Sequence, residues 1–288
     1  MRNNLRKWQL VAAIFFIFSF NLNCENTNKD FEFFFKKLYK DKVEGKNQPL
    51  LAFNISSNFI YLPNIKDKKY LPKTFSYEFF YGFFRESDEF YYDDFTYHSS
   101  EFAFGGNTSS KLDPNKDLSK IYDSWRFGIG WQNGYKYNLN NLEIYLVHKG
   151  TFNWTNLELN YNSELHNINK FQSGLKFGTS YASGVMIKVS GPFQLGIMYE
   201  ESQIHPKYTF SHQLLSLTIE SILQRGIEFF EYDLIYHTGK MYPIYNFIYK
   251  TSISAILYKV REQNVNFPIS SPHPIVNNSI TLNFVFTF

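Results

Sequence analysis

Apolar and polar side chains alternate along much of the chain from about Leu50 onward. Side chains on a β-strand point to opposite faces in turn, so a period of two indicates strands with one apolar and one polar face. One clear stretch is YDSWRFGIGWQ, in which polar or small residues separate the apolar residues Trp125, Phe127, Ile129 and Trp131. In TFSYEFFYGFF the apolar face carries Phe75, Tyr77, Phe79, Tyr81 and Phe83. This pattern predicts an all-β protein built from antiparallel strands.

The stretch VMIKVSGPFQLGIMYEE predicts a hairpin, because the apolar phase is the same on both sides of Gly191 and Pro192. Further strands are expected at Leu51–Tyr61, Leu139–His148, Thr151–Tyr161, Phe171–Tyr181, Tyr208–Ile219, Gly226–Thr238 and Ile244–Val260, and weaker ones at Glu89–Tyr97 and Glu101–Phe104. We therefore expect roughly 10 to 14 strands, with about 12 as the best estimate. Gln213–Gln224 also fits helical spacing, and a helix there would lower the count.

The last stretch of the chain, SITLNFVFTF, alternates most regularly of all. It resembles the C-terminal strand of bacterial outer-membrane β-barrels, which ends on Phe and is recognised by the barrel-insertion machinery. The resemblance implies an antiparallel transmembrane β-barrel with lipid on its apolar face and a polar lumen on the other. It also implies that the insertion machinery is a partner through the apolar face of this strand, formed by Ile280, Leu282, Phe284, Phe286 and Phe288.

The other end of the chain has the layout of a secretory signal. Basic residues precede the apolar run Leu10–Phe20, which is too short for a transmembrane helix. The stretch FEFFFKKLYKDK further on places Phe and Leu at helical spacing, which fits a short amphipathic helix or, equally, a solvated leader. The expected organisation is a signal peptide at 1–23, a leader with this amphipathic helix at 24–48 and a β-barrel domain at 49–288.

The single cysteine, Cys24, follows the apolar run at the place where bacterial lipoproteins carry their acylated cysteine. It is therefore a candidate for lipid attachment, although Asn23 stands where those proteins have a small residue. The alternative is cleavage nearby that leaves a free or removed thiol. One cysteine allows no intrachain disulfide, so an exported chain must be stabilised in another way, such as a closed hydrogen-bonded barrel.

Composition adds to the barrel hypothesis. Aromatic residues are 20% of the 288 residues, yet the mean hydropathy is −0.33 and no second long apolar run is present. A helical membrane protein is excluded by that hydropathy, whereas a barrel with half of each strand polar and aromatic girdles fits it. The formal net charge of +3, with scattered basic residues, argues against a nucleic-acid partner.

The polar faces of the predicted strands collect ionisable residues. Such groups are costly against lipid, so they are expected to line the lumen. Their mixed signs predict ion-pair networks or a narrow polar channel, with most of them bracing the barrel. The expected lumen residues are Glu78, Arg126, Glu143, Glu158, Lys176, Lys188, Glu200 and Lys250, together with Glu231, Asp233 and His237.

The last three of these residues form a local cluster that is a weak candidate for catalysis. Glu231, Asp233 and His237 would share the inner face of a strand in EFFEYDLIYHTGK, where carboxylates could orient an imidazole as a base. The segment faintly resembles the His-containing strand of membrane-barrel lipases and lipid A deacylases, but Thr238 and Gly239 stand where those enzymes carry a serine. Dispersed histidines suggest no metal site, and no motif suggests a cofactor.

The sequence thus predicts a protein of the bacterial outer membrane, surrounded by its lipid, and leaves its role open. A narrow passive pore and a structural barrel that displays loops both fit, and enzyme activity is the less favoured interpretation. The rival class is a soluble periplasmic or secreted lipoprotein with a β-sandwich or a lipocalin-like ligand-binding barrel, in which the apolar faces would point inward. Oligomeric state, substrate and strand number are not determined by the pattern.

Overall fold

The computed structural model describes residues 47–61, 63, 73–91, 95–109, 121–139, 142–160, 171, 174–206, 210–264 and 273–288. The predicted signal peptide, Cys24 and the predicted amphipathic helix of the leader lie outside these residues. All the described residues belong to one compact unit of the chain, Val43–Phe288.

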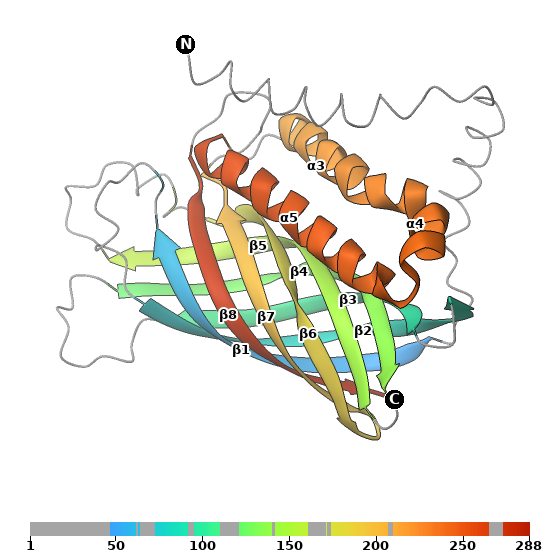
Figure 1. Cartoon of the computed structure of the whole chain (residues 1–288). Coiled ribbons are helices and arrows are strands. Elements are labelled where there is room, and N and C mark those ends of the chain that lie inside the picture. Colours follow the sequence, from blue (N-terminus) through green and yellow to red (C-terminus); the bar gives the residue numbers. More distant parts are fainter. Residues whose placement is uncertain are drawn as a thin grey trace, which may run out of the picture. The chain divides into compact units, whose positions relative to one another are not determined.

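The described strands form one closed antiparallel barrel in which each strand pairs with its neighbour in sequence and the last pairs with the first (Figure 1). They are β1 (Gln48–Tyr61), β2 (Lys73–Tyr91), β3 (Phe95–Ser109), β4 (Ile121–Leu139), β5 (Leu142–Asn160), β6 (Lys176–Ser190), β7 (Phe193–Ile204) and β8 (Ile275–Thr287). The expected transmembrane-type β-barrel is confirmed, and the expected count of about 12 strands is wrong: within the described residues there are 8.

The strand count was too high for two reasons. Strands of up to 19 residues absorb stretches that looked separate, so that Leu139–His148 and Thr151–Tyr161 belong largely to β5. Three other predicted strands fall in a helical segment between β7 and β8. That segment comprises α3 (Phe210–Arg225), the 3₁₀ turn η3 (Gly226–Phe230), α4 (Glu231–Thr238), the 3₁₀ turn η4 (Gly239–Met241) and α5 (Tyr242–Gln263).

Helix and strand are hard to distinguish from the sequence in these three stretches. Apolar residues are frequent at all positions in them, so both the helical and the strand period fit the pattern. The helical alternative for Gln213–Gln224 is the one that the structure shows, in α3. A signal for α5 was present in Pro243, which lies at the start of the helix, where its missing N–H costs nothing.

The faces of the strands agree with a barrel in lipid. Large apolar side chains point outward and are exposed on most strands; examples are Phe79 at 63%, Ile129 at 54% and Ile197 at 60%. Polar and small residues such as Asn54, Ser76 and Gly128 take the inner positions and are buried or half-buried. The lipocalin-like alternative requires the opposite assignment and is wrong.

The last strand completes the barrel between β1 and β7. Of the five residues that form its predicted apolar face, Ile280, Leu282, Phe286 and Phe288 are exposed and Phe284 is half-buried, while Thr281 and Asn283 point inward. Its recognition by the insertion machinery stays a prediction.

The two ends of the barrel differ in their connections. Connections of two or three residues, at 92–94, 140–141 and 191–192, join strands at one end, and Gly191 adopts a φ of 50° in the predicted hairpin turn. The connections at the other end cover 62–72, 110–120, 161–175 and the helical segment 205–274. We call these the short-turn end and the long-connection end. Short periplasmic turns and longer outer loops are typical of outer-membrane barrels.

Candidate functional site

The inner face of the barrel contains a buried ion cluster toward the long-connection end. Arg126 of β4 donates from Nε to Glu78 of β2 and from Nη2 to Oε1 of Glu200 of β7, the latter at 2.8 Å. The carboxylate side chains are 1% and 3% exposed. Because β7 is separated from both β2 and β4 by other strands, these bonds cross the interior from wall to wall. We call Arg126, Glu78 and Glu200 the ion triad.

Aromatic rings fill the next level of the interior. Phe80, Phe102 and Phe104 pack together, with ring centroids 5.3 Å apart for Phe80 against each of the other two. The Lys149 ammonium lies 4.1 Å from the centroid of Phe80, a cation–π arrangement. Gly130 makes room for the rings, since a Cβ there would lie 2.6 Å from Phe102.

A second group of charges lies inside the barrel near the short-turn end. Lys136 pairs with Glu86 and lies 3.8 Å from the carboxylate of Glu143. Lys188 Nζ is 3.2 Å from Glu143 Oε1, and the Tyr145 hydroxyl donates to Glu143 Oε2 at 2.8 Å. Between this group and the aromatic level, the interior is occupied by buried Phe84, His98, Val147, Met186 and Met198. Large side chains and paired charges therefore occupy the interior at successive levels.

The structure places the predicted lumen residues unequally. Glu78, Arg126, Glu143, Lys188 and Glu200 lie in these two charge groups. Lys176 shares the inward phase of β6 and is half-buried at the long-connection end.

Five of the eleven predicted lumen positions are wrong: Glu158, Lys250 and the three residues of the catalytic candidate cluster, which lie on α4. Glu158 is exposed and has the outward phase of Phe152 and Trp154, because β5 runs without a bulge from one predicted strand into the next. Lys250 is buried, but on α5 and not on a strand.

Sequence reasoning missed Glu86, Lys136, Lys149 and the inward aromatic rings. The sequence did contain a sign that Phe80 points inward, because Phe80 falls on the same strand face as Ser76 and Glu78. An aromatic residue on a polar face was not recognised as a filler of the interior.

The catalytic candidates do not form the predicted cluster on a strand. Glu231, Asp233 and His237 are on the helix α4, so they do not share the inner face of a strand as expected from the sequence. The His237 side chain is exposed. Among the described residues no group of three or more His, Cys, Asp or Glu side chains is arranged to hold a metal.

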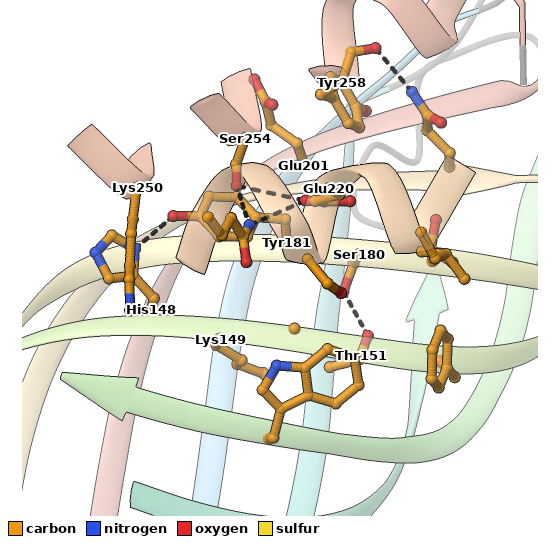
Figure 2. Close-up of a pocket in the computed structure, with 18 of the residues that line it drawn as sticks. His148, Lys149, Thr151, Ser180, Tyr181, Glu201, Glu220, Lys250, Ser254 and Tyr258 are labelled. Carbon is orange, nitrogen blue, oxygen red and sulfur yellow. Dashed lines mark hydrogen bonds between the residues drawn. The ribbon is translucent and has the colours of Figure 1, made fainter. Parts of the chain in front are cut away.

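A cavity of about 100 Å³ lies between the helices and the wall of β4 to β7, and its lining includes polar side chains of both. Figure 2 shows His148 bonded to Tyr181 close to Lys250, and Ser254 bonded to Glu220. The ring of His148 also packs on Phe247 of α5, with centroids 4.9 Å apart.

Hydrogen bonds join the helices to each other and to the barrel. Arg261 of α5 donates to the Ser216 hydroxyl of α3 at 2.8 Å and lies 2.5 Å from Glu220 Oε2. Gln203 of β7 donates to the Tyr258 carbonyl of α5 at 3.1 Å. Among the described helices there is no candidate for an independent transmembrane helix, which needs both sufficient length and an apolar surface all round.

Comparison with known proteins found no matching protein family and no matching curated protein. Among solved structures, the chain is similar to Neisserial surface protein A at 10% identity, over 83% of this chain and 97% of that one, with a TM-score of 0.40. It is also similar to Ail, the attachment invasion locus protein of Yersinia pestis, at 10% identity over 84% and 99% of the two chains, with a TM-score of 0.32. A third is the transport unit of the autotransporter AIDA-I from Escherichia coli, at 11% identity over 58% and 55%, with a TM-score of 0.30. The assignment of this chain to the bacterial outer-membrane type of β-barrel rests on its own strand pairing and its apolar outer face.

Proposed function

We propose that the protein is a sealed structural barrel of the bacterial outer membrane that holds its long connections at the cell surface. The observation that carries this proposal is the filling of the interior, from the ion triad through the aromatic rings to the charge group at the short-turn end. An eight-stranded barrel has an interior just wide enough for side chains to fill. Here the side chains that fill it are large or tied by ion pairs across the interior.

A passive pore is the second interpretation of the sequence, and the interior disfavours it. Moving an ion through the barrel would require water at the level of Phe80, Phe102 and Phe104, which are each 7% exposed or less. It would also require the wall-to-wall bonds of Arg126 to open. Removal of one partner of a buried ion pair costs about 3–5 kcal/mol, which indicates how strongly such charges depend on their partners.

Conductance in planar lipid bilayers tests the proposal. The refolded protein, shown to be folded by a faster gel mobility when unboiled, is expected to give no discrete current steps. The charge-reversal variant Arg126→Glu removes the bonds across the interior, and Lys259→Glu is its matched control, since Lys259 is exposed on α5 outside the barrel.

Discrete current steps from the unmodified protein that change in Arg126→Glu and stay the same in Lys259→Glu would show conduction through the interior. That result would overturn the sealed barrel in favour of a pore.

A further inference from the structure

Helix α5 follows the outer wall of the barrel from one end to the other (Figure 1). At its start, Tyr242 packs on Phe95 and Tyr135, with ring centroids 6.4 and 5.5 Å apart, and Phe95 begins β3 at the short-turn end. At its end, the Tyr258 hydroxyl donates to the Ser202 carbonyl at 2.9 Å and to Asn278 Oδ1 at 3.1 Å. Ser202 and Asn278 lie on β7 and β8 at the long-connection end. The helix therefore occupies the same depth as the apolar outer face of the strands.

The outer wall beneath α3 and α5 is polar where the other strands are apolar. On β5, His148 has the outward phase but lies between the outward apolar residues Leu146 and Phe152, and it is 6% exposed. On β4, Asn133 lies in the same way between Trp131 and Tyr135. The outward positions of this polar strip are Asn133, His148, Thr179, Tyr181, Ser183, Glu201 and Gln203, all buried or half-buried.

The helices turn their polar residues toward this strip. Asn246, Lys250 and Ser254 recur along one side of α5 at intervals of four, and all three are buried. On α3, Ser216 and Glu220 face Arg261 of α5, which donates to the Ser216 hydroxyl and pairs with the Glu220 carboxylate. The strip and the inner sides of the helices thus cover each other.

The outer side of α5 is exposed and mainly apolar, whereas on α3 the exposed residues Thr218 and Ser221 lie beside Leu215 and Ile222. Tyr245, Ile248 and Ile256 of α5 are 50%, 55% and 41% exposed, and Leu215 and Ile222 of α3 are 44% and 59% exposed. Charged residues border this apolar face at both ends of α5, where Lys240 precedes the helix and Lys259 lies in its last turns, both exposed. From Tyr242 to Lys259 the helix rises about 26 Å at 1.5 Å per residue. The apolar band of an outer-membrane barrel is about 25 Å tall.

We propose that the apolar outer face of α3 and α5 is a lipid-binding surface in contact with the acyl chains of the membrane. The helices then supply the apolar outer surface that the strands lack at the polar strip. As a result, a continuous apolar band, the apolar girdle, surrounds the barrel. The inference rests on the proposed membrane location, because the girdle has a lipid partner only there. Continuity with the rest of the wall argues for lipid as the occupant. The exposed apolar residues Trp131 and Val185 lie directly beside Asn133 and Ser183 of the polar strip, so the helix that covers the strip adjoins the apolar face of the strands.

Quenching of a fluorescent label by spin-labelled lipid tests the proposal in the full mature chain, refolded into phosphatidylcholine vesicles. A Cys24→Ser background leaves no other thiol. An environment-sensitive fluorophore is attached at Ile248→Cys on the helix. Ile129→Cys on the wall of β4 serves as the lipid reference, and Gln263→Cys, exposed at the end of α5, as the aqueous reference.

The expected result is quenching at Ile248→Cys equal to that at Ile129→Cys and at least twofold stronger than at Gln263→Cys, with slow reaction of the Ile248→Cys thiol toward a membrane-impermeant maleimide. Quenching at Ile129→Cys but not at Ile248→Cys, with fast maleimide reaction at the latter, overturns the lipid surface and leaves the membrane barrel intact. Protection of Ile248→Cys from both reagents, with Ile129→Cys quenched, overturns it in favour of a protein cover on this face, either the leader of this chain or a second chain. Absence of quenching at Ile129→Cys overturns the membrane location itself.

Discussion

The ion triad shows how one side chain holds two walls of the barrel together. Arg126 is 11% exposed and contacts two carboxylates that have little access to water. A buried pair contributes little compared with apolar residues of the same volume, but the loss of one partner leaves an uncompensated charge. The three residues are therefore energetically coupled: substitution of one changes the contribution of the other two to the stability of the barrel.

Substitution of Arg126 by Met should lower the free energy of unfolding by about 3–5 kcal/mol, because the buried carboxylates of Glu78 and Glu200 lose the partner that they share and keep only their weaker interaction with the Lys149 ammonium. Urea unfolding in lipid vesicles measures this. Arg85→Met is the matched control, since Arg85 is half-buried and bonded to the side chain of Asn47, and it should cost less than about 1 kcal/mol. Adding Glu78→Gln and Glu200→Gln to Arg126→Met should recover much of the loss; equal losses in the Arg126 and Arg85 variants would contradict the coupling.

At the scale of the element, the helical segment is a cover whose parts depend on each other. Arg261 ties α5 to α3 through Ser216 and Glu220, and Gln224 of α3 donates to Ser254 of α5 at 2.6 Å. The strands, by contrast, have a closed backbone ladder that does not use the helices. Loss of the contacts between helices should therefore loosen α3 without opening the barrel.

Arg261→Ala should raise hydrogen–deuterium exchange in α3 by tenfold or more while the strands keep their protection, because removal of a buried charge partner costs more than about 1.4 kcal/mol, a factor of ten in an opening equilibrium. Gln263→Ala, two residues away and exposed at the end of α5, is the control and should leave exchange unchanged. Loss of protection in the strands as well would show that helices and barrel open as one unit.

The asymmetry of the connections gives the whole barrel a direction. The connections 110–120 and 140–141 lie at opposite ends, since they precede and follow β4. Long connections on the outer side and short turns in the periplasm are the rule in outer-membrane barrels. The helical segment begins and ends at the long-connection end, and we expect that end at the cell surface.

An epitope tag inserted in 110–120 should be bound by antibody on intact cells, whereas the same tag at 140–141 should be bound only after the outer membrane is permeabilised. Flow cytometry measures antibody binding to each tag on intact and on permeabilised cells. Each tagged protein is first shown to keep its heat-dependent gel mobility, so that exposure is measured on a folded barrel. Labelling of the 140–141 tag on intact cells, with none at 110–120, would reverse the orientation.

The alternating pattern was enough to predict the barrel class and the face of many residues. Trp125 to Trp131 on the outside, and Glu78, Arg126 and Glu200 on the inside, follow from the period of two and the cost of charge against lipid. The pattern misplaced Glu158, because a phase inferred for a short stretch cannot be checked until the full strand and its register are known.

Period alone could not separate the helices from strands. The residues of α5 are apolar on the side away from the barrel and partly polar on the side toward it. A helix on the surface of a soluble protein has the opposite arrangement, with its apolar face toward the core. His148 and Glu201 likewise have a phase that assigns them to lipid, and only the helices that cover them explain why they are polar.

The class of fold and the apolar outer face of the strands could be predicted from the sequence alone. The alternation of a strand is a local property, and each strand in a membrane needs its own apolar face toward lipid. The number of strands, the partners of Arg126 and the place of the helices became visible only in the folded chain. These three features depend on contacts between segments that meet across the barrel or on its outer wall. Contacts between residues far apart in the chain produce no periodic pattern in the sequence, so they could not be predicted from it.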